Sequence, residues 1–379
     1  MISRLDLHHF KCFELLKLPL SPLTLLSGSN ASGKSTVLQA LVLLHQTIKE
    51  YEWSTRLMLN GDSIRLGTVS DTVDKVHGRT TFKISIVDDE IPYAWIFSGD
   101  RSEMSMAVDS VNIGYELYQQ PDKLRYLLPP EADELAWSLS RRLKRLSYIT
   151  AERVGPREVY SLEDIQVADV VGPTGEYALS LLHWGRDEQA LRGLVLEGAP
   201  STRLRQVEER MAKFFPGCGL TLQQVPQANA IILGLRTSKD TDFHRPVHGG
   251  FGLTQVLPII VAAISANEGD LILIENPEVH LHPAGQALMG QFLAEAVRAG
   301  LQVIVETHSD HVLNGIRRSV KAGNLGPEQV SIHFFRSRMD KASQVISPQL
   351  DRSGNIDEWP EGFFDQFDKD MNYFAGWGQ

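Results

Sequence analysis

The segment Gly28-Ser-Asn-Ala-Ser-Gly33-Lys34-Ser35 decides the fold of this chain, because it matches the phosphate-loop pattern GxxxxGK[ST] in full. The apolar run that precedes it, residues 23–27, predicts a buried strand. The apolar-striped stretch from Lys34 to about Glu50 predicts a helix. A glycine-punctuated turn between a strand and a helix directs backbone N–H groups and the positive end of the helix dipole at one point. The sequence therefore predicts a phosphate-binding loop.

This loop supplies most of the candidate nucleotide-binding residues. Lys34 is expected to reach the β- and γ-phosphates, and the Ser35 hydroxyl to be a ligand of Mg²⁺. We therefore expect ATP and Mg²⁺ to bind here. The candidate residues are Gly28, Ser29, Asn30, Ala31, Ser32, Gly33, Lys34, Ser35 and Thr36.

Two further apolar runs end in polar residues. Leu271-Ile-Leu-Ile-Glu275-Asn276-Pro277-Glu278 predicts a buried parallel strand whose terminal acid, Glu275, would hold Mg²⁺ directly or through water. Residues 303–309 predict a second buried strand, after which His308 could hydrogen-bond the γ-phosphate. A histidine at a strand end is commonly structural, but its position after the acid-ended strand favours the functional interpretation.

A second glycine-rich loop, His248-Gly249-Gly250-Phe251-Gly252-Leu253-Thr254-Gln255, precedes an apolar helix. Such loops often only cap helices, yet this one would place a second anion site on the same chain. Two phosphate cradles in one chain are explained if one subunit's loop and another subunit's loop enclose one ATP. We therefore expect Gly250, Gly252 and Thr254 to face the γ-phosphate bound by a partner subunit.

The composition is that of a globular protein with a substantial core: 42% of the 379 residues are hydrophobic, and 22% are charged. The formal net charge of −10 argues against a protein that binds DNA over its whole surface, but it does not exclude a local basic groove. The only cysteines are Cys12 and Cys218, which disfavours a disulfide framework. We expect a cytoplasmic location, with neither a signal peptide nor a membrane span.

The order of these motifs predicts an α/β fold in four segments. Residues 1–100 would form the first part of a nucleotide-binding unit, 101–235 an inserted mixed and partly helical subdomain, 236–345 the second part, and 346–379 an aromatic-rich tail. Within the insertion we expect helices at 131–146 and 201–215. The basic cluster at 141–145 is interpreted as the solvated end of the first of these helices. The tail aromatics either pack over the core or form a docking surface.

In this order the motifs resemble those of the ABC/SMC-like ATPases, and most closely the RecF-like and OLD-like (overcoming-lysogenisation-defect) group found in bacterial anti-phage systems. Glu278-Val-His280-Leu-His282-Pro283 is similar to that group's stretch after the Walker B acid, and residues 250–258 are similar to its signature helix. Residues 151–157 and 172–176 also resemble segments of these proteins, and residues 354–365 resemble the tail of one subgroup of stand-alone ATPases. The resemblance covers both ends of the chain well and the middle poorly.

The resemblance implies an ABC/SMC-type ATPase head, with a mixed sheet around the P-loop and an antiparallel β subdomain, that forms a homodimer on ATP. Glu275 would be the Walker B acid and His308 the switch histidine. Asn276 departs from the family, because much of the family has the catalytic glutamate there and an amide cannot accept a proton at neutral pH. Either Glu278 serves instead, or hydrolysis is slow. The family's Q-loop glutamine has no clear counterpart, and Asp71 is a substitute candidate.

The predicted function is that of an ATPase that dimerises around Mg-ATP and controls a separate effector, such as a nuclease, in a bacterial anti-phage defence complex. One alternative is a RecF-like repair ATPase that binds DNA. Another is a scaffold that binds ATP without turnover, which Asn276 suggests. The cassette of a membrane transporter is disfavoured, because residues 248–255 lack the sequence Leu-Ser-Gly-Gly-Gln.

Overall fold

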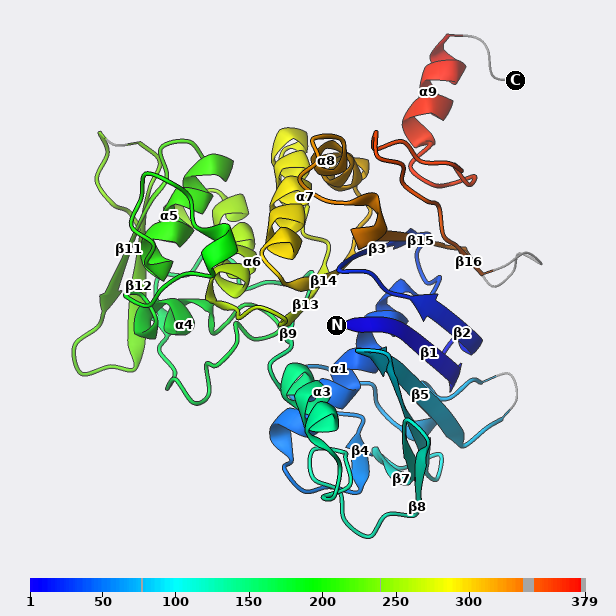
Figure 1. Cartoon of the computed structure of the whole chain (residues 1–379). Coiled ribbons are helices and arrows are strands. Elements are labelled where there is room, and N and C mark those ends of the chain that lie inside the picture. The colour runs from blue at the N-terminus through cyan, green and yellow to red at the C-terminus, as the bar shows by residue number, and fades with distance from the viewer. Residues whose placement is uncertain (76–77, 239, 337–343, 376–379) are drawn as a thin grey trace.

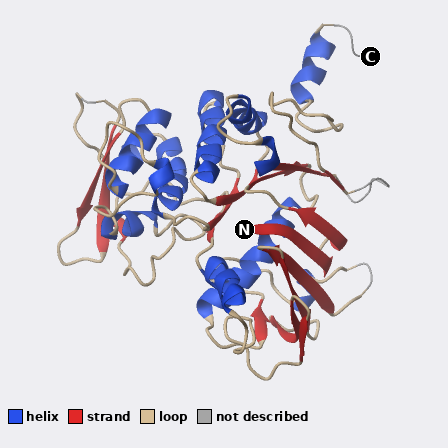
Figure 2. Cartoon of the chain, viewed as in Figure 1, coloured by secondary structure: helices blue, strands red, loops and turns tan. Residues whose placement is uncertain are grey.

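The computed structural model describes residues 1–75, 78–238, 240–336 and 344–375, with the side chains of 366–368 left aside. Its described part contains three β-sheets, and helices pack between and around them (Figures 1 and 2). The expected α/β fold with a mixed sheet around the P-loop is confirmed. In the described part of the chain, no helix has the length and apolar character needed to cross a bilayer.

One sheet is antiparallel and includes the chain's first two strands. Its order is β2-β1-β5-β6-β7-β4, with β8 paired to β7. The strands are β1 (Ile2–Phe10), β2 (Phe13–Pro19), β4 (Arg56–Met58), β5 (Thr81–Asp88), β6 (Ile91–Ser98), β7 (Ser105–Ile113) and β8 (Glu116–Gln119). The expected boundary at residue 100 was wrong, because it falls between β6 and β7, which pair within this one sheet.

The central sheet has the order β16-β15-β3-β14-β13-β9, and its pairs are parallel except for β15 with β16. Its strands are β3 (Leu23–Gly28), β9 (Ser147–Ile149), β13 (Leu271–Glu275), β14 (Gln302–Glu306), β15 (Val330–Phe335) and β16 (Val345–Ile346). Because β3, β14 and β13 are parallel neighbours, their carboxyl ends meet at one edge. Strand β9 lies within 101–235, so that segment also supplies a strand of the central sheet and is not wholly an insertion.

Helix α1 (Lys34–Glu50) is buried between the antiparallel and central sheets. The central sheet separates two hydrophobic cores, because side chains alternate between its two faces along β13. Leu271 and Leu273 face α1, whereas Ile272 and Ile274 face the opposite side. The opposite side is covered by α6 (Phe251–Ser265), α7 (Pro283–Arg298) and α8 (Asp310–Lys321). Apolar residues on both faces account for the continuous apolar runs of these strands.

A smaller lobe packs against α6. It contains a three-stranded sheet of order β10-β12-β11. Its elements are β10 (Tyr160–Ser161), α4 (Ala178–Trp184), η1 (Arg192–Leu194), α5 (Arg203–Phe214), β11 (Gly219–Gln224), β12 (Ala230–Arg236) and η2 (Pro246–His248). The expected helices at 131–146 and 201–215 correspond to α3 (Glu134–Lys144) and α5. The β11–β12 hairpin is a feature that the sequence patterns did not predict.

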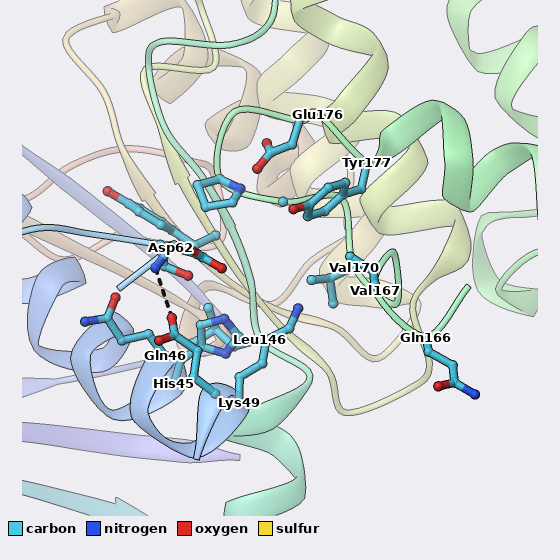
Figure 3. A pocket seen from close by; sticks show the side chains of 15 residues that line it. His45, Gln46, Lys49, Asp62, Leu146, Gln166, Val167, Val170, Glu176 and Tyr177 are labelled. Atoms are coloured by element: carbon cyan, nitrogen blue, oxygen red, sulfur yellow. Dashed lines mark hydrogen bonds between the residues drawn. The ribbon is translucent and has the colours of Figure 1, made fainter. Parts of the chain in front are cut away.

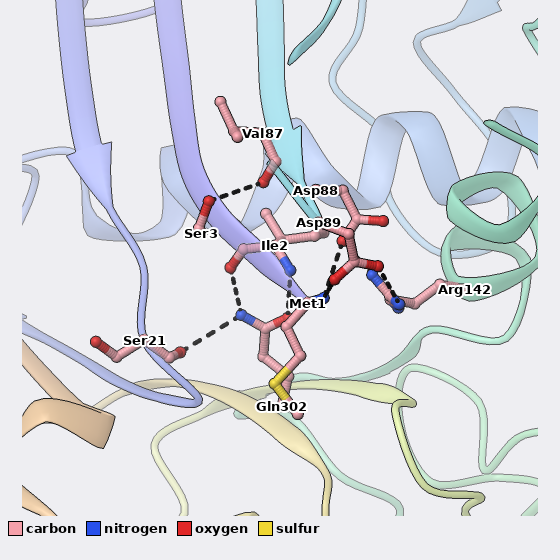
Figure 4. Close-up of polar contacts among 9 residues, drawn as sticks. All are labelled: Met1, Ile2, Ser3, Ser21, Val87, Asp88, Asp89, Arg142 and Gln302. Atoms are coloured by element: carbon pink, nitrogen blue, oxygen red, sulfur yellow. Dashed lines mark hydrogen bonds and ion pairs between the residues drawn. The ribbon is translucent and has the colours of Figure 1, made fainter. Parts of the chain in front are cut away.

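From the sequence, the basic cluster on α3 is expected to be solvated. Two of its cations instead make ion pairs within the protein. Arg142 pairs with the buried Asp88 at the end of β5, and Arg145 pairs with Asp270 just before β13, at 3.1 Å. The same region holds Gln302 of β14, whose amide exchanges two hydrogen bonds with the backbone of Ile2 (Figure 4). These contacts join α3 and the antiparallel sheet to the central sheet.

Some aromatic side chains of the C-terminal segment pack over the core, and others are exposed to solvent. Phe363 is fully buried, and its ring lies 5.4 Å from that of Phe334. Tyr373 and Phe374, on α9 (Gln366–Phe374), are instead 72% and 81% exposed. The predicted tail aromatics at 367 and 377 lie outside the described side chains. The remaining short helices are α2 (Val69–Thr72) and η3 (Pro327–Gln329).

Candidate functional site

The P-loop has the backbone that its glycines permit. Gly28 and Gly33 have φ angles of 137° and 107°, which residues with a Cβ atom rarely adopt. A Cβ at Gly28 would lie 2.1 Å from the carbonyl oxygen of Phe335, and one at Gly33 would lie 2.5 Å from the ring of Phe13. The loop therefore runs close against β15 and β2 and opens into α1, as a phosphate cradle requires.

Lys34 lies inside this cradle. Its ammonium donates to the carbonyl oxygens of Gly28 and Ser29, at 3.1 and 2.8 Å, and lies 3.8 Å from the Glu306 carboxylate. Burial lowers the pKa of Lys34, and Glu306 acts in the opposite direction. A buried cation beside free N–H groups of a helix start is suited to bind the terminal phosphates of a nucleotide.

Two carboxylates, Glu275 and Glu306, lie at the ends of β13 and β14. Glu275 accepts hydrogen bonds from the Tyr148 hydroxyl at 2.7 Å and from the Ala151 amide at 3.4 Å. Glu306, beside it in the parallel register, is buried and receives the Ser35 hydroxyl, and burial raises its pKa. Its Oε2 atom finds no hydrogen-bond partner within the described part of the chain.

These oxygens suit Mg²⁺ with a nucleotide. Among the described residues, no group of three or more His, Cys, Asp or Glu side chains is placed to hold a metal. In nucleotide sites, however, Mg²⁺ usually takes one or two carboxylates together with substrate phosphates and water. The Ser35 hydroxyl and the carboxylates of Glu275 and Glu306 therefore fit the ion. Glu306 had no predicted role, because its proximity to Lys34 depends on β14 lying beside β3.

Hydrogen bonds join Glu278, which follows β13, to the segment after β14 that carries His308. The two oxygens of Glu278 accept from the Thr307 hydroxyl at 2.8 Å and from the His308 backbone amide at 2.9 Å. Thr307 Oγ1 in turn accepts from the Ser309 amide at 3.0 Å. Glu278 therefore holds the segment that carries His308. Burial lowers the pKa of His308, Lys34 acts in the same direction, and Glu278 opposes them.

Asn276 adopts a left-handed backbone conformation with φ of 42°. Its backbone N–H donates to the carbonyl oxygen of Glu306 at 2.8 Å. The buried Arg153 donates to the carbonyl oxygens of Glu275 and Asn276, at 2.5 and 2.9 Å. Burial lowers the pKa of Arg153 to about 10, so it stays a cation at neutral pH. Arg153 and Tyr148 were missed as site residues, although 151–157 already stood out by resemblance.

One pocket of about 390 Å³ brings the predicted P-loop residues 30–36 together with His308, and Gly28 lines the neighbouring cleft beside His308. It is also lined by Lys11, whose ammonium donates to Gln39 at 2.6 Å, and by Glu306. Gln39 lies on the first helix, where no counterpart of the Q-loop glutamine was expected, yet its side chain reaches this pocket. Asp71 instead caps α2, where it accepts from the Thr68 amide at 3.0 Å.

The second glycine loop lies elsewhere on the chain. Gly250 is the N-cap of α6 and is exposed, and an added Cβ would meet no described atom within 4 Å. Phe251 beside it is 55% exposed. Gly252 and Thr254 are buried, and the Thr254 hydroxyl donates to Phe251 O at 3.0 Å. The Thr254 hydroxyl is thus used inside its own helix, and the expectation that Gly250, Gly252 and Thr254 face a partner's γ-phosphate stays a prediction.

A further pocket lies behind Tyr148, between the C-terminal half of α1 and the loop at 166–177 (Figure 3). Its polar groups pair within the chain: Lys49 donates to Asp169 at 2.8 Å, and Glu50 accepts from the Asp62 amide at 2.9 Å. Tyr148, whose ring lines this pocket, donates its hydroxyl to Glu275 of the nucleotide site. We assign it no ligand.

Several known families match this chain. A model described as "AAA domain, putative AbiEii toxin, Type IV TA system" matches residues 115–314, and one described as "AAA ATPase domain" matches residues 1–102. A model described as "Protein of unknown function (DUF3696)" matches residues 325–373. The OLD nuclease of Thermus scotoductus is 23% identical over 322 residues. That match covers 82% of this chain but only 59% of the relative's length.

The fold is also similar to solved SMC heads. A SmcHead bound to the C-winged helix domain of ScpA has a TM-score of 0.57 and 16% identity, covering 93% of this chain and 98% of that one. An Smc head domain with an extended coiled coil, bound to the C-terminal domain of ScpA derived from Pyrococcus furiosus, has a TM-score of 0.55 and 14% identity, covering 99% and 98%. Because the first family model spans more than half of the chain, the chain belongs to that AAA-domain family; it is similar to an OLD nuclease over most of its length, and its fold is that of an SMC-type head.

Proposed function

We propose that this protein binds and slowly hydrolyses Mg-ATP between two copies of itself, and that the closed dimer controls a separate effector. The observation that carries the proposal is the separation of the two anion-binding elements. The P-loop pocket is lined by Lys34 and His308, whereas the exposed N-cap of α6, Gly250, lines a different groove. Two half-sites on different surfaces of one chain are complete only when two chains meet.

In this proposal the nucleotide is bound mainly by the P-loop. The backbone amides from Gly28 to Ser35 and the Lys34 ammonium offset the negative charge of the phosphates. Ser35 and Glu275 hold the Mg²⁺ ion, with Glu306 beside them, and the ion supplies further neutralisation of phosphate charge. Gly250 of the second copy adds the positive end of α6 from the opposite side.

The hydrolytic step is proposed to be slow because the position after Glu275 is an amide. Asn276 can orient an attacking water but cannot remove its proton. Glu278, the candidate base two residues further on, already accepts two hydrogen bonds from residues 307 and 308. We assign it to positioning His308, whose lowered pKa keeps the imidazole neutral at pH 7 and so able to contact a phosphate oxygen without carrying charge.

The effector is proposed to be a separate nuclease of a bacterial anti-phage system, acting in the cytoplasm. The relationship to an OLD nuclease, of which this chain spans 59%, supports this choice. The RecF-like alternative is less favoured, because Arg142 and Arg145 are committed to internal ion pairs and do not form a free basic stripe. The scaffold alternative, motivated by Asn276, differs only in the absence of turnover.

The dimer is tested by measuring molecular mass in solution with and without Mg-ATP. We compare wild type with Lys34→Ala, Gly250→Asp and Gly250→Asn. Aspartate and asparagine are both good N-caps, so both substitutions keep α6 intact, but only aspartate places a negative charge against the partner's phosphate. We expect nucleotide-dependent dimers for wild type and for Gly250→Asn, and monomers for the other two variants.

A mixture of the two defective variants sharpens the test. Lys34→Ala retains a good α6 N-terminus, and Gly250→Asp retains a good P-loop, so the mixed dimer has one intact composite site. We expect the mixture to recover part of the Mg-ATP dimer that neither variant forms alone. Dimerisation by Gly250→Asp equal to that of Gly250→Asn, or no recovery in the mixture, would contradict assembly across two chains.

A further inference from the structure

The two carboxylates of the nucleotide site lie on neighbouring strands, at different distances from the P-loop. Glu306 ends β14, which pairs with β3, and Glu275 ends β13, which pairs with the other edge of β14. Paired strands are about 4.8 Å apart, so Glu306 is one strand spacing from the strand that leads into the P-loop and Glu275 is about two. Both carboxylates point to the α1 side of the sheet, because Leu273 and Ile304, two residues before them, face α1. Glu306 is therefore the carboxylate nearer to the start of α1.

The hydrogen bonds of Glu275 hold its carboxylate on the side away from the P-loop. Its two oxygens accept from the Tyr148 hydroxyl at 2.7 Å and from the Ala151 backbone amide at 3.4 Å. Tyr148 belongs to β9, which pairs with β13 on the edge opposite to β14. Among the described residues, Glu275 is not one of those that line the P-loop pocket. Both of its oxygens are thus already engaged by the protein.

Glu306 has the opposite arrangement. It lines the P-loop pocket together with Lys34 and Ser35, and it is only 6% exposed. Its Oε1 atom lies 3.8 Å from the Lys34 ammonium, and the carboxylate accepts from the Ser35 hydroxyl. Its Oε2 atom has no hydrogen-bond partner among the described residues, and a buried polar atom left in this way is costly. Glu306 therefore offers an unused oxygen next to the hydroxyl that we expect to be a ligand of Mg²⁺.

We propose that Glu306 is the carboxylate that binds the nucleotide's Mg²⁺ directly, and that Glu275 acts on the ion only through water. This inference rests on the Mg-nucleotide part of the proposed function and refines it. Mg²⁺ in nucleotide sites usually keeps several waters and takes one or two carboxylates together with phosphates, so one direct protein carboxylate is sufficient. Without the ion, the Glu306 charge lies beside Lys34 and repels an approaching phosphate. Glu306 therefore makes nucleotide binding depend on the metal.

The metal dependence is measured with ADP in place of ATP. ADP lacks the γ-phosphate that a second copy's Gly250 would face, so its binding reports on the P-loop of one chain alone. Calorimetric titration of the full chain gives the dissociation constant of ADP with Mg²⁺ and with EDTA, and the ratio of the two constants is the metal dependence. A buffer at about pH 8, well above the usual pKa of a carboxyl group, keeps the carboxylates ionised.

Glu306→Gln keeps the shape of the side chain and removes its charge. We expect it to bind ADP roughly threefold more tightly in EDTA, because a repulsion is lost, and roughly tenfold less tightly with Mg²⁺, because a ligand is lost. The matched control is Glu275→Gln, at the same level of the neighbouring strand, which should leave binding in EDTA unchanged and lower the metal dependence less. Weaker binding of Glu306→Gln under both conditions, or an equal loss of metal dependence in the two variants, would overturn the assignment.

A second measurement separates a direct ligand from a charge that acts at a distance. The EPR signal of free Mn²⁺, used in place of Mg²⁺, gives the dissociation constant of the metal from the protein–ADP complex without any turnover. Glu306→Asp keeps the charge but draws the carboxylate back by one methylene group. We expect this variant to bind Mn²⁺ roughly tenfold more weakly, with wild-type ADP binding in EDTA. Wild-type Mn²⁺ affinity in Glu306→Asp would overturn the direct contact.

These titrations also keep the assignment separate from the proposed dimer. Neither measurement requires two chains to meet, so a wild type that stays monomeric with Mg-ATP would remove the dimer and leave the role of Glu306 intact. Equal metal dependence of wild type and Glu306→Gln in a protein that does dimerise would remove only the role of Glu306. A wild type that binds no ADP, with or without Mg²⁺, would remove both.

Discussion

Replacing Glu278 by glutamine distinguishes a positioning role from a role as general base. The substitution retains the shape but turns one acceptor oxygen into an NH₂ group, which would face the Thr307 hydroxyl or the His308 amide. Hydrogen bonds to a charged group contribute about 1.5–3 kcal/mol each. If that contribution is lost from the arrangement that places His308, kcat should fall roughly 10- to 150-fold, since about 1.4 kcal/mol corresponds to tenfold.

The assay is phosphate release under saturating Mg-ATP, with Thr307→Val and Thr307→Ser alongside. Thr307→Val removes one of the two hydrogen bonds while leaving the Glu278 carboxylate in place, and Thr307→Ser retains the hydroxyl. A positioning role predicts that Glu278→Gln and Thr307→Val lose similar activity and that Thr307→Ser loses little. A general base would instead give a loss of about 10²–10⁴ for Glu278→Gln with a small effect of Thr307→Val. An unchanged rate for Glu278→Gln would refute both roles.

Three other perturbations follow from particular contacts. Gly28→Ala should abolish nucleotide binding, because its Cβ would meet Phe335 O at 2.1 Å, whereas Gly114→Ala, also at positive φ but with no described atom within 4 Å, should not; titration with a fluorescent ATP analogue checks both. Arg142→Ala should lower the free energy of unfolding by about 3 kcal/mol, because it leaves buried Asp88 without that partner, while Arg141→Ala, paired with exposed Glu134, should cost at most about 1 kcal/mol in urea melts. Burial lowers the pKa values of His45 and His333 to about 4. As the pH falls below 6.5, the unfolded chain therefore binds protons at these histidines before the folded chain does, and the free energy of unfolding should drop by roughly 1.4 kcal/mol per pH unit for each histidine between pH 6.5 and 4. In urea melts across this pH range, His333→Gln should show a smaller slope than wild type.

The sequence was sufficient to predict those parts of the site that follow from local pattern and parallel geometry. The P-loop, Glu275 and His308 each come directly after an apolar strand, and parallel strands bring their carboxyl ends to one edge. Glu306 was not predicted, because its role depends on β14 lying beside β3. Gln39 was not predicted, because its role depends on the Lys11 side chain reaching it from the end of β1. Strand order is set by tertiary packing, and no periodicity in a single segment encodes it.

The errors in domain boundaries have two causes. Strand β7 pairs with its chain neighbour β6 across residue 100, so the antiparallel sheet simply continues past the expected boundary. Strand β9 joins the central sheet from within the supposed insertion, and this pairing connects segments far apart in the chain, with Ile149 of β9 opposite Ile274 of β13. Short strands of three residues carry too few side chains for a two-residue alternation to be recognised.

Arg153, one of the residues that the sequence pattern missed, connects the turn after β13 with helix α6. Arg153 donates to the carbonyl oxygens of Glu275 and Asn276, and its own carbonyl accepts from the Gln255 amide on α6 at 3.4 Å. The Walker B turn and the helix that begins at Gly250 are therefore linked through one buried arginine. Its Nε and Nη1 atoms find no partner among the described side and main chains, so the cation depends on these few contacts. A shift of Glu275 toward a metal-bound nucleotide would consequently alter the support of α6, and in the proposed dimer this would give a physical route by which the state of one composite site reaches the other.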